Sequence, residues 1–181
     1  MATLTLELPP LKRQMSFNLR RWAELCADPE LADFEGRIET DRHGHIIMNP
    51  PAEAGHGESQ FEIGYLLRTL LPRGRVITEC PISTADGVKV ADAAWASPER
   101  VKERGAQACY TRAPEICVEV ISPSNTKAEI QEKMALYFDA GAREVWICSR
   151  TGSMSFYTSG STGPARASAI CLRFPKQITL K

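Results

Sequence analysis

The chain has 181 residues, of which 43% are hydrophobic and 24% are charged. This length suits one well-filled core and is short for two, so we expect a single domain over residues 1–181. The 22 basic and 22 acidic side chains give a formal net charge of zero, which excludes nucleic-acid binding driven by an overall positive field. Any affinity for nucleic acid must come from a local patch.

The six cysteines form no C-x-x-C pair and no zinc-type cluster with histidine. Cys117 and Cys148 fall in expected core strands, which indicates reduced, buried thiols and favours the cytosol over a secreted compartment. Residues 1–14 lack the apolar run of a signal peptide, and no stretch of about 18 apolar residues could span a membrane. We therefore expect a cytoplasmic protein with no membrane partner.

The first predicted elements are helical segments on either side of a hairpin. Residues 1–15 are expected to form an N-terminal tail, and a helix begins at Ser16 and cannot continue smoothly past Pro29. Residues 36–49 resemble two short strands around a turn. A helix over about residues 58–71 then follows, with a wide apolar surface.

Two strands are predicted next, at residues 75–80 and 88–95. Because side chains alternate along a strand, Asp92 shares one face of the second strand with Val88 and Val90. Asp92 therefore interrupts an apolar face.

Residues 116–121 are apolar and β-branched enough for a strand buried on both faces, and Glu119 lies inside that run. An unpaired carboxylate there would be costly, so Glu119 must meet a cation, a metal or a hydrogen-bond network. Residues 124–126 can then cap a helix that ends near Ala140, before Gly141.

Lys133 lies within the apolar arc of that predicted helix. One interpretation is a lysine whose stem packs on the core while its ammonium reaches solvent. The other is a lysine placed for chemistry.

A strand at residues 144–148 follows after a short turn, which predicts a parallel, right-handed βαβ unit. A hairpin leads into residues 154–157, residues 159–169 are expected to form a flexible loop, and a last strand is expected at 170–174. The fold class is therefore α/β with a mixed sheet, in the order helix, strand, strand, strand, helix, strand, preceded by an N-terminal helix and hairpin.

In this layout, two acids on neighbouring inner strands and a lysine could face one cleft. Asp92 and Glu119 would supply hard oxygen ligands for magnesium, with manganese as a possible substitute. The ion would polarise a phosphodiester and lower the pKa of a bound water, while Lys133 would orient the nucleophile and stabilise the developing negative charge.

The order and the residues resemble the Uma2 family of restriction endonucleases, within the PD-(D/E)XK nuclease superfamily. The similarity is carried by GRIETDRHGHIIMNPP, VKVADAAWAS, EICVEVISPSNTKAEIQEKMALYFDAGAREVWI and SFYTSG, of which the third is the most specific. It implies a restriction-endonuclease-like core and a metal-dependent endonuclease acting on DNA, often as a homodimer.

The resemblance also implies roles for individual residues. Asp92 matches the aspartate of the superfamily motif, Glu119 matches its second acid, and Lys133 looks like a lysine that has migrated to the following helix. Glu39 and Glu62 match weaker acidic positions. The sequence departs from the family by having Ala91 where a proline is common and Glu129 where an aspartate is common.

Alternatives remain for each candidate. Asp92 could pair with Lys89 or Arg75, and Glu119 could form an internal ion pair with Lys133 without any metal. The second possibility describes a noncatalytic binding or assembly module that retains the nuclease fold. No histidine is assigned to catalysis, and His56 is expected as a helix-start or surface residue.

Overall fold

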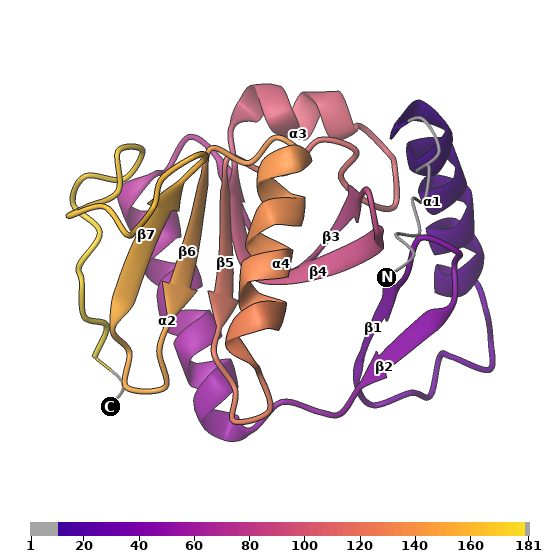
Figure 1. The fold of residues 1–181 in the computed structure, drawn as a ribbon, viewed down its shortest axis with the longest axis horizontal. Coiled ribbons are helices and arrows are strands. Elements are labelled where there is room, and N and C mark those ends of the chain that lie inside the picture. Colours follow the sequence, from indigo (N-terminus) through magenta and orange to yellow (C-terminus); the bar gives the residue numbers. More distant parts are fainter. Residues whose placement is uncertain (1–10, 180–181) are drawn as a thin grey trace, which may run out of the picture.

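The computed structural model describes residues 11–179, which form a five-stranded mixed sheet, a two-stranded sheet and four helices (Figure 1). In chain order the elements are α1 (Leu11–Cys26), β1 (Arg37–Thr40), β2 (Ile46–Asn49), α2 (Ala54–Leu70), β3 (Arg75–Thr84), β4 (Gly87–Ala96), α3 (Pro98–Arg104), β5 (Ile116–Val120), α4 (Lys127–Asp139), β6 (Glu144–Cys148) and β7 (Met154–Thr158). This confirms the predicted fold class and the order helix, strand, strand, strand, helix, strand, except that the short helix α3 lies between β4 and β5.

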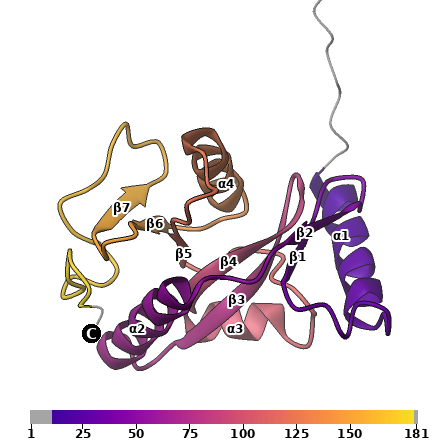
Figure 2. The ribbon, with the colours of Figure 1, turned by 90° about the horizontal axis from the view of Figure 1, so that it is seen from below.

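The large sheet has the strand order β3-β4-β5-β6-β7. Only β5 and β6 run parallel, because α4 connects them by a crossover, and the other neighbours are antiparallel. Figure 2 shows α4 over one face of this sheet and α2 over the other. Both faces of the central strands are therefore covered.

Every residue of β5 and β6 is buried, as the apolar sequences predict. Ile116, Val118 and Val120 pack toward the cluster that contains Ile63 of α2, whereas Cys117 packs toward the cluster that contains Tyr137 of α4. Because side chains alternate along a strand, Glu119 points to the α4 face.

The amino-terminal boundaries differ from the prediction. Helix α1 begins at Leu11, so residues 11–15 are helical and not part of a tail, while residues 1–10 lie outside the described part of the chain. Gln14 donates a 2.8 Å hydrogen bond to Asn18 one turn later, and both side chains are buried. Helix α2 likewise begins earlier than expected, at Ala54.

Two other segments correct the prediction. The charged segment after β4 forms α3, with Ser97 as its N-cap and Pro98 in its first turn, two signals that are visible in the sequence. The strand predicted at residues 170–174 does not form, and that segment has turns and irregular structure. It is held by buried Cys171 and Phe174. Flexibility of residues 159–169 stays a prediction.

All six cysteines are free, and five of them are buried. This agrees with the expectation of reduced thiols. Within residues 11–179, no helix is both long and apolar enough to cross a membrane.

Candidate functional site

Asp92 of β4 and Glu119 of β5 lie where these two strands diverge. The β4–β5 ladder ends at the pair Ala93 and Val118, and the next opposed residues in this register would be Asp92 and Glu119. In place of a ladder bond, the backbone N–H of Val120 donates to Asp92 Oδ2 at 2.6 Å. The Asp92 side chain therefore fills the fork between the two strands.

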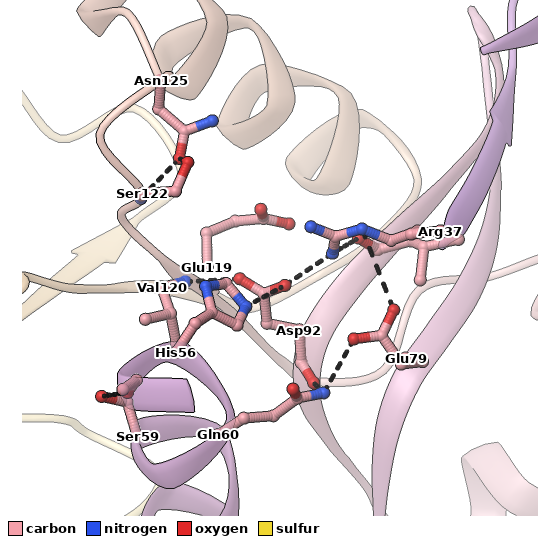
Figure 3. A network of polar contacts seen from close by, with 12 residues as sticks. Arg37, His56, Ser59, Gln60, Glu79, Asp92, Glu119, Val120, Ser122 and Asn125 are labelled. Atoms are coloured by element: carbon pink, nitrogen blue, oxygen red, sulfur yellow. Dashed lines mark hydrogen bonds and ion pairs between the residues drawn. The ribbon is translucent and has the colours of Figure 1, made fainter. Parts of the chain in front are cut away.

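Asp92 is fully buried and meets positive groups on its other oxygen. Arg37 Nη1 of β1 lies 2.5 Å from Asp92 Oδ1, and His56 Nε2 of α2 lies 3.1 Å from the same atom (Figure 3). Burial raises the pKa of Asp92, but His56 and Arg37 more than offset this, so that the pKa lies below its ordinary value. Asp92 is therefore ionised at neutral pH.

His56 itself is positioned by charge. Its Nε2 atom is buried and lies 3.1 Å from Asp92 Oδ1, within ion-pair distance. Proximity to Asp92 raises the pKa of His56 despite partial burial. The expectation of a helix-start residue is met, but the side chain is only 10% exposed and lines the site.

Glu119 is 4% exposed and has two partners from α4. Tyr137 Oη donates to Glu119 Oε1 at 2.7 Å, and Lys133 Nζ lies 3.2 Å from Glu119 Oε2. Burial and the charge of Asp92 nevertheless raise the pKa of Glu119 to about 7, against the favourable effects of Lys133 and Tyr137. The partners of Glu119 therefore only partly offset the cost of ionising this buried carboxyl.

Lys133 connects Glu119 to Glu39 of β1. Its Nζ lies 2.9 Å from Glu39 Oε1 and also donates to the carbonyl of Val90 at 3.4 Å. Burial lowers the pKa of Lys133, but Glu119 and Glu39 raise it above the ordinary value. Lys133 is therefore protonated at neutral pH and cannot serve as a general base there.

A cleft of about 630 Å³ opens over these residues. Charged side chains of both signs line it, namely Arg37, Glu39, Glu53, His56, Asp86, Lys89, Glu119, Glu129, Glu132, Lys133 and Arg150. Asp92 does not line the cleft, whereas its two ion-pair partners, Arg37 and His56, do. A ligand in the cleft can therefore contact Glu119 and Lys133 directly.

The structure brings together four of the five residues that the sequence suggested, namely Asp92, Glu119, Lys133 and Glu39. Glu62 lies elsewhere on α2, outside the cleft lining. The suggested partners of Asp92 were wrong, since Arg37 and His56 pair with it and Lys89 pairs with Asp86 at 3.0 Å. The suggested ion pair between Glu119 and Lys133 is present.

Arg37, Gln60 and Glu79 also belong to this network and were not identified from the sequence. Arg37 shares one face of β1 with Glu39 by the period of two, and Gln60 follows His56 by one helical turn, so both spacings carried a signal. Glu79 carried none, because its position depends on a local change of backbone conformation in β3.

The donor set can be compared with what a divalent ion requires. Within residues 11–179 no group of three or more histidine, cysteine or acidic side chains is arranged to hold a metal. Magnesium often uses only one or two protein carboxylates and completes its shell with water, so Asp92 and Glu119 are sufficient in type and number. Glu119 lines the cleft, so an ion in the cleft could reach its carboxylate. The residues therefore fit such an ion.

Comparisons with known proteins bear on the fold and the family. No curated protein matches the chain. Among solved structures, a protein described as a "putative nuclease belonging to DUF820" from Anabaena variabilis ATCC 29413 shares the fold, with a TM-score of 0.63 and 19% sequence identity. The similarity covers 77% of this chain and 80% of that one.

The family model Uma2, described as "Putative restriction endonuclease", matches residues 23–180, which include every residue of the network described above. The match confirms the resemblance seen in the sequence and supports a nuclease-like function. The chain belongs to the Uma2 family.

Proposed function

We propose that this protein is a metal-dependent endonuclease that hydrolyses DNA phosphodiester bonds through a metal-activated water. The observation that carries the proposal is the placement of Asp92 and Glu119 at one strand fork, with Lys133 beside Glu119 under an open cleft. Membership of the Uma2 family supports the same reaction class.

In this proposal Asp92 and Glu119 hold magnesium, and manganese can replace it. When bound, the ion would act as a Lewis acid on the phosphate and lower the pKa of a coordinated water. No covalent enzyme intermediate is required.

Lys133 supplies a positive charge that is held in a fixed place at the cleft. Because its pKa is raised, it is protonated at neutral pH and can stabilise the negative charge that develops on the phosphate oxygens. Its contacts with Glu39 and Glu119 hold the ammonium at the cleft. Glu39 is thus a positioning residue for Lys133, and the Val90 N–H, which donates to Glu39 Oε1 at 2.9 Å, fixes Glu39 in turn.

The substrate in this proposal is DNA that reaches the cleft from its open side. The mixed charges of the lining give no uniformly positive surface, so binding would depend on local contacts and on the ion. We further propose that the protein acts in the cytoplasm as a homodimer, since two copies related by a two-fold axis could cut both strands of a duplex.

A noncatalytic binding or assembly module is the second candidate. It is favoured by the charge pairing already present, because Lys133 neutralises Glu119 and Arg37 neutralises Asp92 without any metal. This candidate predicts that divalent ions change neither DNA binding nor the stability of the fold.

Cleavage of supercoiled and single-stranded DNA with magnesium or manganese separates the two candidates. Wild type, Asp92→Asn and Lys133→Ala should be purified identically, with Lys127→Ala as a matched control because Lys127 is an exposed lysine of α4 outside the cleft lining. We expect cleavage by wild type and the control and its loss in both site variants while folding persists. Absence of cleavage by wild type on all substrates would favour the module.

A further inference from the structure

Arg37 occupies a position between two carboxylates on adjacent strands of the sheet. Its Nη1 atom lies 2.5 Å from Asp92 Oδ1, and its Nε atom lies 3.8 Å from Glu79 Oε2 (Figure 3). The Asp92 carboxylate is 1% exposed, whereas the Glu79 side chain is 51% exposed. The guanidinium therefore has one buried partner and one partner at the surface.

The backbone of β3 departs from regular strand geometry at this place. Glu79 has a φ of +48°, the one positive φ of a non-glycine residue in the described chain. The β3–β4 register pairs Thr78 with Ala93 and Cys80 with Ala91, so Glu79 and Asp92 are opposed but unpaired. Such a conformation is unfavourable for a residue with a Cβ atom and is retained where the surroundings require it.

Gln60 of α2 holds this irregularity in place. Its Nε2 atom donates to the backbone carbonyl of Asp92 at 2.6 Å and to Glu79 Oε1 at 2.9 Å. One amide group thus satisfies the carbonyl that the ladder leaves free and fixes the Glu79 carboxylate beside Arg37. Gln60 therefore holds the second partner of Arg37 beside the guanidinium.

We propose that Arg37 is a built-in counter-ion of the metal site, which pairs with Asp92 in the metal-free protein and moves to Glu79 when a divalent ion is bound. The inference rests on the proposed function, because it assigns Asp92 to an ion. A divalent ion at Asp92 would repel the guanidinium of Arg37, which lies 2.5 Å from the same carboxylate. Since Nε already lies near Glu79, rotation of the Arg37 side chain is sufficient for the exchange.

The exchange makes Arg37 and Glu79 act on metal affinity in opposite directions. Arg37 on Asp92 competes with the ion, so its removal should tighten binding. Glu79 offers Arg37 an alternative partner, so its removal should weaken binding. If Arg37 covers Asp92 in about nine molecules of ten, the apparent Kd is about tenfold weaker than that of the uncovered site.

Binding of Mn²⁺ by isothermal titration calorimetry to wild type, Arg37→Gln, Glu79→Gln and the double variant tests this. We expect Arg37→Gln to bind about tenfold more tightly and Glu79→Gln to bind more weakly than wild type. The double variant should match Arg37→Gln, because Glu79 acts through Arg37. Exposed Arg13→Gln and Glu58→Gln serve as controls for the general loss of charge.

The possible outcomes separate the inference from the proposed function. If wild type binds Mn²⁺ and Arg37→Gln binds it with the same or a weaker affinity, the inference is overturned and the proposed function is not. Absence of Mn²⁺ binding by all four proteins would overturn both. Binding by Arg37→Gln but not by wild type would support the counter-ion. If Arg37→Gln does not fold by circular dichroism, Arg37→Lys replaces it, and its affinity should lie between those of wild type and the uncovered site.

Discussion

Wild type should lose stability between about pH 5 and pH 8 because Glu119 ionises in that range. The variant Glu119→Gln should not show this loss. The amide cannot ionise, but it retains an oxygen that can accept the Tyr137 Oη–H, which lies 2.7 Å from Glu119 Oε1. Lys133 keeps Glu39 as its partner at 2.9 Å. The substitution therefore removes the ionisation of Glu119 and little else.

The sign and size follow from the pKa of Glu119, which is about 7 in the folded protein against an ordinary 4.5. The folded state binds this proton more tightly than the unfolded state, so the stabilisation is fully present below pH 4.5 and is lost as the pH rises through about 7. At about 1.4 kcal/mol per pH unit, the loss amounts to about 3 kcal/mol.

Urea unfolding in EDTA buffers from about pH 5 to about pH 8 measures this effect. The free energy of unfolding of Glu119→Gln, relative to wild type, should rise by about 2.5 kcal/mol across that range, because part of the loss already occurs below pH 5. Glu58→Gln, which alters an exposed carboxyl on α2, should run parallel to wild type. A constant difference between Glu119→Gln and wild type at every pH would refute the reasoning.

Three further substitutions test the contacts that hold the site and the surrounding elements of the fold. Tyr137→Phe removes a buried donor to Glu119 and should lower the free energy of unfolding by about 1–3 kcal/mol in urea at neutral pH. Asn18→Ala removes three hydrogen bonds from α1 to the β3–β4 turn and should cost about 2–3 kcal/mol in the same assay, and no loss would contradict the role of this contact. Glu144→Gln weakens an acceptor of four hydrogen-bonding groups, so limited proteolysis should cut residues 159–179 faster than in wild type.

The parts of the fold that were predicted correctly are those in which local pattern and tertiary role agree. The buried strand β5 and the capped helix α4 have a clear hydrophobic pattern and clear start and stop residues. Both lie near the expected boundaries. Residues 170–174 carry a strand-like pattern, but Ile170, Cys171 and Phe174 pack against the core while the segment joins no ladder of the sheet. Periodicity reports burial and cannot show whether the backbone also pairs.

The same distinction explains which residues of the candidate site could be identified from the sequence. Asp92, Glu119 and Lys133 could be identified because each places a charge in an otherwise apolar surface. Arg37 carried a weaker signal, its spacing of two from Glu39 on β1, and its role becomes clear only when β1 lies beside β4. Glu79 carried no signal, because its position depends on the backbone irregularity of β3. Hydrogen bonds from Arg37 and Lys133 to the carbonyl of Val90 show how closely these elements meet.

Charge balance at the site leads to a last prediction. Four carboxylates, those of Glu39, Glu79, Asp92 and Glu119, meet two permanent cations, those of Arg37 and Lys133. The negative charges exceed the positive ones by two, and the raised pKa values of Glu119 and His56 show that protons can supply what is missing.

A bound dication would supply the same two charges, so acidification and divalent ions should stabilise the fold through the same groups. At about pH 8, magnesium at a hundred times its Kd should raise the free energy of unfolding by about 2.7 kcal/mol, whereas near pH 5 it should add much less because protons already occupy the site. Urea unfolding with and without magnesium at both pH values measures the difference. Equal stabilisation at the two pH values would show that the ion binds elsewhere, because a site formed by Asp92 and Glu119 cannot take up the ion and the protons independently.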